Sequence, residues 1–252
     1  MNFKNKTVLI TGASRGIGKA TAIAFDKKGA KIGINFRNNV EEAQKTLAAL
    51  PGKGHRLFQT DISKKENCQS LMDEFISAYG QIDVLVNNAG ISIFHEIDTV
   101  DFEHWTHAWE HTFTTNLFAT ANMTYWAAQA MMKTGGGRIV NVSSRGAFRG
   151  EPTKPAYGAS KAALNAMTQS LAKKLAPYNI YLGVVAPGFT ETEMAAVTLT
   201  PAERENLLRE SPFQRMAQPK EVAHAILFLA SEGAEYASGT IIDVNGASYL
   251  RS

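Results

Sequence analysis

Cysteine is nearly absent from this sequence, as are the features that direct a chain out of the cell interior. The only cysteine among 252 residues is Cys68, so no disulfide can form within the chain. A cysteine-poor chain suits a reducing compartment. The first ten residues, MNFKNKTVLI, lack the long apolar stretch of a secretory signal peptide. These absences predict a cytoplasmic protein.

Charge of one sign is also scarce, and so are long apolar runs. The formal net charge is +3, and like charges do not gather in extended blocks. The sequence therefore indicates neither nucleic acid nor a membrane surface as a partner. The longest uncharged stretch, Thr112–Met132, contains threonines, Asn116, Asn122 and Gln129, which make it too polar for a membrane span. We interpret this stretch as a buried helix.

The sequence does contain a regular alternation of short β-branched runs with longer helical patterns. The expected strands are Thr7–Ile10, Lys31–Phe36, Arg56–Gln59, Val84–Asn87, Arg138–Val142, Ile180–Val185 and Thr240–Val244. Helical segments begin near Gly18, Val40, Lys64, Phe102, Tyr157 and Pro219. This order is typical of an α/β fold with a doubly wound, Rossmann-like parallel sheet. We expect a single domain over residues 1–252, with a helical lid at about 187–218.

Glycines cluster in TGASRGIG, residues 11–18, directly after the first expected strand. A turn at this place lets phosphates approach the backbone and begins a helix whose N-terminus carries partial positive charge. Gly12 permits the turn, Gly16 leaves room for a pyrophosphate, and Gly18 allows close packing of helix on strand. The turn alone also fits an ordinary connection between a strand and a helix.

Three polar residues in the second half of the chain suggest proton transfer. Tyr157 and Lys161 lie four residues apart in an expected helix, so their side chains share a face. An ammonium beside a phenol lowers the phenol pKa from ~10, which predicts Tyr157 as general acid in reduction and general base in oxidation. Ser144 follows an expected strand at the edge where such sheets bind ligands, and its hydroxyl is expected to hold a substrate carbonyl oxygen. Each residue alone also fits a surface helix or a turn, so the combination carries the prediction.

Motifs in a fixed order extend this pattern over almost the whole chain. They are TGASRGIG (11–18), NNAG (87–90), Asn116, Ser144, YGASK (157–161) and PG (187–188). With these motifs the sequence resembles the short-chain dehydrogenase/reductase family, most of all its 3-oxoacyl-acyl-carrier-protein reductase-like branch. Ser144 rather than the adjacent Ser143 matches the family spacing. The resemblance implies that Lys161 binds the nicotinamide ribose, that Asn116 supports a water-linked proton relay, and that the protein is a homotetramer.

The end of the second expected strand, KIGINFRNN, bears on the choice of cofactor. NAD-preferring enzymes usually place an acidic residue about 20 residues past the glycine turn. This chain has Phe36 there, followed by Arg37. A 2′-phosphate would meet no carboxylate at this place, and Arg37 and Arg15 can both reach it, so we predict NADP(H). Arg37 alone also fits a solvated loop residue.

The predicted site draws on loops along one edge of the sheet. By resemblance, Asp61 and Ile62 contact the adenine edge, while Asn88, Ala89 and Gly90 line the adenosine side. The residues expected at the cofactor are Gly12, Ser14, Arg15, Gly16, Ile17, Gly18, Arg37, Asp61, Ile62, Asn88, Ala89, Gly90, Tyr157, Lys161, Pro187, Gly188 and Thr190. The expected catalytic residues are Asn116, Ser144, Tyr157 and Lys161. The expected border of the substrate pocket is Phe94, Arg145, Phe148, Phe189 and Met194.

A histidine cluster and the single cysteine are the remaining candidates for chemistry. His104, His107 and His111 share a helical face, but neither a carboxylate–histidine motif nor the chemistry of the fold calls for a metal. We predict no metal and interpret the histidines as polar or interface residues. Cys68 is interpreted as a small residue on a helix face rather than a nucleophile.

The sequence departs from the family pattern at two places. After NNAG it has ISIFHEID where reductases of acyl-carrier substrates often have a Thr-Arg-Asp-like run, which puts acyl-carrier specificity in doubt. Tyr181 and Gly183 stand where relatives commonly have arginine and asparagine. We predict an NADP(H)-dependent oxidoreductase that interconverts a small-molecule carbonyl and a secondary alcohol. Its substrate is a 3-oxoacyl thioester or, alternatively, a sugar, steroid-like or other small alcohol; a silent dinucleotide sensor is the non-enzymatic alternative.

Overall fold

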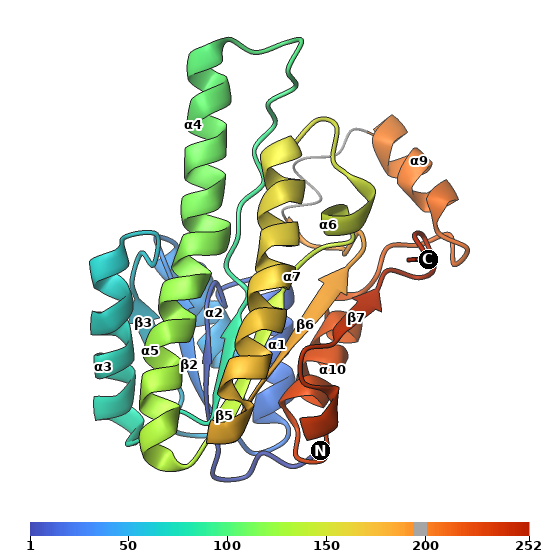
Figure 1. Cartoon of the computed structure of the whole chain (residues 1–252). Coiled ribbons are helices and arrows are strands. Elements are labelled where there is room, and N and C mark those ends of the chain that lie inside the picture. Colours follow the sequence, from blue (N-terminus) through green and yellow to red (C-terminus); the bar gives the residue numbers. More distant parts are fainter. Residues whose placement is uncertain (194–200, 252) are drawn as a thin grey trace.

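Seven parallel strands form one sheet in the computed structural model, which describes residues 1–193 and 201–251 and all their side chains except those of 201–203, 206 and 207. The spatial order is β3-β2-β1-β4-β5-β6-β7 (Figure 1). The strands are β1 (Thr7–Ile10), β2 (Lys31–Phe36), β3 (Arg56–Gln59), β4 (Val84–Asn87), β5 (Gly137–Val142), β6 (Ile180–Pro187) and β7 (Ile241–Val244). Each expected strand is present, and the predicted doubly wound fold is confirmed.

Helices cover both faces of the sheet (Figure 1). On one face lie α1, α2 and α10, and on the other lie α3, α5 and α7. The helices are α1 (Gly16–Asp26), α2 (Val40–Ala48), α3 (Lys65–Tyr79), α4 (Phe102–Phe113), α5 (Ala119–Thr134), α6 (Gly146–Arg149), α7 (Pro155–Leu175), α9 (Pro201–Glu210) and α10 (Pro219–Ala230). Shorter turns are η1 (Thr114–Phe118), η2 (Ala176–Tyr178) and η3 (Glu235–Ala237).

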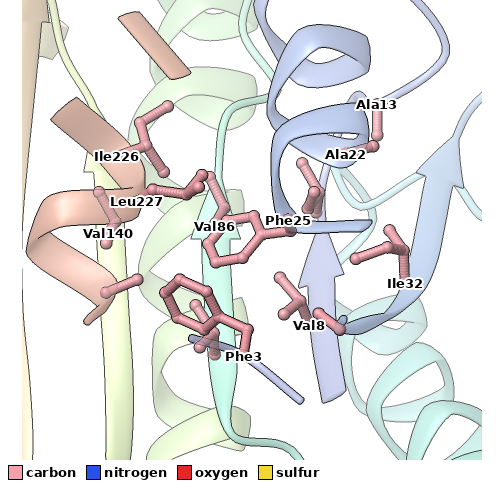
Figure 2. Close-up of a cluster of buried hydrophobic side chains, with 14 of the residues drawn as sticks. Phe3, Val8, Ala13, Ala22, Phe25, Ile32, Val86, Val140, Ile226 and Leu227 are labelled. Atoms are coloured by element: carbon pink, nitrogen blue, oxygen red, sulfur yellow. The ribbon is translucent and has the colours of Figure 1, made fainter. Parts of the chain in front are cut away.

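Alternating side chains of β1, an interior strand of the sheet, point into the two layers of the core. Val8 and Ile10 of β1 join one buried cluster, which also contains Phe25 of α1 and Phe3 (Figure 2). Leu9 points to the opposite cluster, as the two-residue period of a strand requires. The Phe3 and Phe25 rings meet edge-on with centroids 4.7 Å apart. Both faces of the strand are therefore apolar, which is typical of a buried parallel sheet.

The unusual residues of β6 serve packing. The guanidinium of Arg138 lies 4.5 Å from the centre of the Tyr181 ring. A Cβ added at Gly183 would come within 2.9 Å of Leu229 in α10. Glycine at this position therefore allows α10 to lie close against the sheet, and the neighbours described for Tyr181 and Gly183 are Arg138 and Leu229 rather than the predicted catalytic residues.

The stretch Thr112–Met132, interpreted as one buried helix, is divided among the end of α4, η1 and α5. Met123, Ala127 and Met131 of α5 are buried against the sheet. Among the described helices, none has both the length and the apolar character needed to cross a lipid bilayer. Figure 1 shows α4 projecting beyond the carboxyl ends of the strands.

The strand order reverses between β1 and β4, so the loops that follow these strands diverge and leave a crevice at the carboxyl edge. The predicted lid at about 187–218 includes α9, but part of this interval, with Met194, lies outside the described residues. The lid and the single-domain boundaries stay predictions. The crevice is the place where ligands bind in doubly wound sheets.

Candidate active site

A cleft of about 590 Å³ occupies this crevice. It is lined by loops that follow β1, β2, β3, β4, β5 and β6 and by the start of α7. All but two of the predicted cofactor and catalytic residues line it; Gly18 and Asn116 are the exceptions and support the lining from behind. The structure thus brings the predicted set together at one site.

The glycine turn has the backbone geometry expected of a phosphate cradle. Gly12 and Gly16 have positive φ angles of 61° and 56°, which residues other than glycine rarely adopt. A Cβ at Gly18 would lie 2.5 Å from the carbonyl oxygen of Gly12. The helix α1 begins at Gly16, two residues before the expected start, and directs its free N–H groups at the cleft.

A pair of side chains holds this turn against the end of β4. The Asn88 amide donates to the carbonyl oxygens of Thr11 and Gly12 at 3.0 and 2.9 Å. The Thr11 hydroxyl accepts from the backbone N–H groups of Asn88 and Ala89 at 3.0 and 3.1 Å. Asn88 therefore braces the two strands with its side chain, and Thr11 is a contributor that the sequence analysis did not single out.

Positive charge faces the cleft at the end of β2. Phe36 is buried, whereas Arg15 and Arg37 are exposed at the cleft wall. Partial burial by itself would raise the pKa of Asp61, but hydrogen bonds from Ser63 and the charge of Arg37 bring it below the usual value. The Ser63 hydroxyl donates to Asp61 at 2.7 Å. This end of the cleft offers two guanidinium groups and one carboxylate that is held in place.

Asn116 lies in η1, a π-helical turn between α4 and α5. Its amide donates to the Ile91 carbonyl oxygen at 3.0 Å and to the Ser160 hydroxyl at 3.2 Å. Its carbonyl oxygen accepts from the Ile91 N–H at 2.8 Å. The fully buried Asn116 thus ties the loop after β4 to α7, and the local change of helical register is a feature that the sequence pattern did not predict.

Ser144, Tyr157 and Lys161 meet at the other end of the cleft. The side chains of Tyr157 and Ser144 are hydrogen-bonded to each other. The Lys161 ammonium donates to the Val142 carbonyl oxygen at 2.8 Å and lies 5.9 Å from the centre of the Tyr157 ring. The Gly146 N–H donates to the Ser144 hydroxyl at 3.0 Å, which fixes that side chain.

Burial governs the protonation of this group. It lowers the pKa of Lys161 to about 8. Burial also raises the pKa of Tyr157 above its ordinary value; the Ser144 hydrogen bond opposes this and the charge of Glu151 adds to it. The expected lowering of the phenol pKa by Lys161 is not found in this structure: burial raises the pKa, and the group that lowers it is the Ser144 hydroxyl. Tyr157 keeps its proton at neutral pH and is set up as a donor.

The substrate end of the cleft differs in part from the prediction. Arg145 and Phe189 line the cleft, with the guanidinium 4.7 Å from the ring centre. Phe94 and Phe148 lie outside the lining that the described residues form: Phe94 packs against Lys154 and Phe148 against Arg251. Met194 lies outside the described residues. Phe148 lies outside the lining because helix α6, which follows β5, places its ring beside Arg251 near the C-terminus.

Further polar residues at this end were not singled out from the sequence. Glu151 and Lys154, from the loop between Ser144 and Tyr157, both line the cleft. Arg145 donates to Glu210 of α9 at 2.6 Å and to Ser248 at 2.7 Å. Glu151 and Lys154 could have been predicted at the cleft, because their loop lies in sequence between two predicted catalytic residues. The sequence contains no local signal for the partners of Arg145, which are far away along the chain.

The histidines of α4 are not gathered as metal ligands. Across residues 1–193 and 201–251, no group of three or more histidine, cysteine, aspartate or glutamate side chains is placed to hold a metal ion. His104 is bonded to the Phe94 carbonyl oxygen at 3.0 Å, and the His107 and His111 rings stack with centroids 5.7 Å apart. Cys68 is buried in the helix α3, as expected for a packing residue.

This fold and cleft define a dinucleotide-binding α/β protein. The family whose sequence model matches residues 6–202 is described as short chain dehydrogenase. The chain is 38% identical over 248 residues to the 3-oxoacyl-acyl-carrier-protein reductase FabG of Thermotoga maritima, with 98% of each chain covered. It is 37% identical to the FabG of Escherichia coli, with 99% of this chain and 100% of the relative covered.

A solved structure agrees with these relatives. A 7α-hydroxysteroid dehydrogenase complexed with NADH and 7-oxo glycochenodeoxycholic acid superimposes with a TM-score of 0.90 and 31% identity, covering 97% of this chain and 94% of the other. The chain therefore belongs to the short-chain dehydrogenase/reductase family, in its FabG-like branch. It is an oxidoreductase of the kind that interconverts carbonyl compounds and alcohols with a nicotinamide dinucleotide.

Proposed function

We propose that this enzyme reduces a ketone to a secondary alcohol, and catalyses the reverse, with Tyr157 moving the proton. The observation that carries the proposal is the half-buried Tyr157 phenol, hydrogen-bonded to Ser144 one helical turn from the buried Lys161. The Ser144 hydroxyl orients the substrate carbonyl oxygen, and the Tyr157 hydroxyl donates its proton to that oxygen in reduction. In oxidation the deprotonated Tyr157 oxygen receives the proton of the alcohol. Lys161 and Asn116 position the groups along which the proton moves.

The cradle suits a nicotinamide dinucleotide. Gly12 and Gly16 leave backbone space that a Cβ would fill, and the N-terminus of α1 offers N–H groups to a pyrophosphate. Lys161 would bind the nicotinamide ribose, while Pro187, Gly188 and Thr190 would close the other side. When bound, the cofactor supplies or accepts the hydride, and the residues of this chain supply the proton and the orientation.

We further propose a preference for NADP(H). Phe36 has no group that can bind the ribose hydroxyls, and Arg15 and Arg37 are free to meet a 2′-phosphate at the cleft wall. The solved relative that carries NADH is a different enzyme, so cofactor preference has to be measured on this one. The measurement is kcat/KM for NADPH and NADH with one substrate.

The substrate class we propose first is a 3-oxoacyl thioester, because the FabG relatives are 38% and 37% identical over nearly the whole chain. A cyclic ketone, of the kind the hydroxysteroid dehydrogenase binds, is the second candidate. A panel of 3-oxoacyl thioesters, steroid ketones and sugars, assayed by NADPH absorbance, separates them. A protein that binds NADPH but turns over no carbonyl or alcohol in the panel would instead be a dinucleotide sensor.

The test of the proposed chemistry is Tyr157→Phe, which removes the transferable proton and keeps the ring. We expect kcat to fall at least ~100-fold, with NADPH binding retained, because the general acid is lost. A variant that keeps half of the wild-type rate would overturn the assignment of Tyr157.

We also propose a homotetramer. Large apolar side chains of α4, η1 and α5 remain exposed: Phe102 at 80%, Phe118 at 54% and Tyr125 at 56%. Burial against a second copy would remove this surface from water. Sedimentation that gives a stable monomer at micromolar concentration would contradict it.

A further inference from the structure

His95 lies in the segment ISIFHEID, where the chain departs from the family pattern. Its side chain is fully buried between α4 and the beginning of α7. The rings of Trp105 and Trp109, one turn apart on α4, lie edge-on to the imidazole with centroids 5.4 and 6.4 Å away. A buried, titratable side chain is thus enclosed next to the helix that carries Tyr157, and the proposed chemistry does not use it.

The hydrogen bonds of His95 define its protonation state. The backbone N–H of Ala156 donates to Nε2 at 3.1 Å, so Nε2 carries no proton. In the neutral ring the proton is then on Nδ1, which donates to the Ile93 carbonyl oxygen at 2.9 Å. The backbone N–H of His95 donates to the Thr153 carbonyl oxygen at 3.0 Å. Both ends of this residue are therefore joined to the segment that begins α7.

The first turn of α7 needs an acceptor from outside. Its N-cap residue is Lys154, whose side chain has no acceptor, and its first residue is Pro155, which has no N–H. The first free donor of the helix is the N–H of Ala156, immediately before Tyr157. A buried N–H without a partner costs about 1–3 kcal/mol, and the imidazole of His95 supplies the acceptor that a serine or aspartate cap would usually give.

We propose that His95 is a positioning residue for Tyr157. It caps α7 from the loop after β4, and Trp105 and Trp109 hold the imidazole in the orientation that presents Nε2 to Ala156. This inference rests on the proposed function, in which the Tyr157 hydroxyl moves the proton. Loss of the cap frees the first turn of α7, and with it the phenol, while the glycine turn that receives the dinucleotide is built by other loops.

The experiment compares His95→Leu and His95→Gln with His107→Leu, which removes an exposed imidazole from α4. For His95→Leu we expect kcat to fall about 10- to 100-fold, because small displacements of a catalytic group cost that much, while the Kd of NADPH stays within about twofold. The amide oxygen of Gln reaches as far as Nε2, so His95→Gln is expected to recover most of kcat. His107→Leu should keep the wild-type values.

Hydrogen exchange at the Ala156 amide gives a second readout that does not depend on turnover. We expect slow exchange in the wild type and in His95→Gln, and faster exchange in His95→Leu. Fast exchange in the wild type overturns the cap even if His95→Leu fails to fold. A folded His95→Leu with wild-type kcat also overturns the proposal.

Tyr157→Phe, measured beside these variants, separates the two levels of inference. If Tyr157→Phe keeps the wild-type rate, the proposed function fails, and with it the positioning role. If Tyr157→Phe is inactive while His95→Leu is fully active, only the role of His95 fails.

Discussion

The two ends of the cleft are built in different ways. At the adenosine end, the backbone of one tight turn forms the site, and the selective groups, Arg15 and Arg37, are exposed at its wall. At the catalytic end, Asn116 and Lys161 are buried; Asn116 accepts a hydrogen bond from the loop after β4, and Lys161 donates one to the end of β5. Exposed charges keep most of their hydration on folding and so cost little free energy, whereas buried polar groups lose their hydration and need hydrogen bonds in its place. Changes at the two ends should therefore have different consequences for activity and for stability.

The largest effect is expected at the catalytic end, from Ser144→Ala. The substitution removes the hydroxyl that is bonded to Tyr157, so the carbonyl oxygen of the substrate loses an oriented donor. Loss of one such donor typically lowers kcat by about 100- to 1,000-fold. The measurement is kcat with a good substrate, with NADPH binding followed separately.

Ser143→Ala is the matched control for this prediction. Ser143 is the preceding residue, and its hydroxyl donates to the Lys161 carbonyl oxygen at 3.3 Å. We expect its loss to lower kcat less than about tenfold, as for a single neutral hydrogen bond. If Ser143→Ala is the more damaging variant, the family spacing has assigned the wrong serine.

A smaller effect, on selectivity, is expected at the adenosine end. Charge-assisted bonds to a 2′-phosphate contribute roughly 1.5–3 kcal/mol each, so kcat/KM for NADPH should exceed that for NADH by at least ~10-fold. Phe36→Asp combined with Arg37→Ile should reverse the preference, because the carboxylate accepts from the ribose and repels the phosphate. The ratio of the two kcat/KM values is independent of the folded fraction.

Arg56→Ile serves as the control, because Arg56 is an exposed arginine at the start of β3, whereas the cleft lies at the carboxyl ends of the strands. It should leave the cofactor ratio unchanged. A wild-type enzyme that uses NADH as well as NADPH would show that Arg37 is only a solvated loop residue.

The sequence predicts the adenosine end of the cleft better than the catalytic end. The strands, the glycine turn and the residues at strand ends depend on local pattern, and the structure places them as expected. The direction of the Tyr157 pKa, the π-helical turn at Asn116 and the cap from His95 depend on burial by segments far apart in sequence. Phe148 illustrates the limit: it was expected at the border of the substrate pocket, but its ring packs against Arg251 instead.

The catalytic end should also make folding pH-dependent. The pKa of buried Lys161 is about 8, below the ordinary 10.5, so between these values the unfolded chain holds more protons than the folded one. The free energy of unfolding should therefore rise with pH across this window, and the cost of burial is fully present below about pH 8. Lys161→Met should stabilise the cofactor-free protein at pH 7 by about 1–3 kcal/mol after loss of the Val142 bond.

Urea unfolding at pH 7 and pH 10 checks this prediction, with the exposed Lys31→Met as control. The gain from Lys161→Met should shrink at the higher pH, where the wild-type lysine is largely neutral in the folded state. A gain that is equal at both pH values, or a loss at pH 7, would show that the ammonium is well solvated in the folded protein.

The smallest effect is expected beneath the adenosine end, at Cys68. The thiol donates to the Ile62 carbonyl oxygen at 3.3 Å, and burial raises its pKa to about 11. Because the thiolate is the reactive form, iodoacetamide at neutral pH should leave the folded enzyme unlabelled and fully active, whereas the urea-unfolded chain should be labelled completely. Cys68→Ala should change the Kd of NADPH less than about twofold, since the residue packs behind the wall and presents no charge to the cofactor. Stoichiometric labelling of the folded protein would mean that the loop carrying Asp61 and Ile62 opens readily, and that the adenosine end is less firmly packed than the catalytic end.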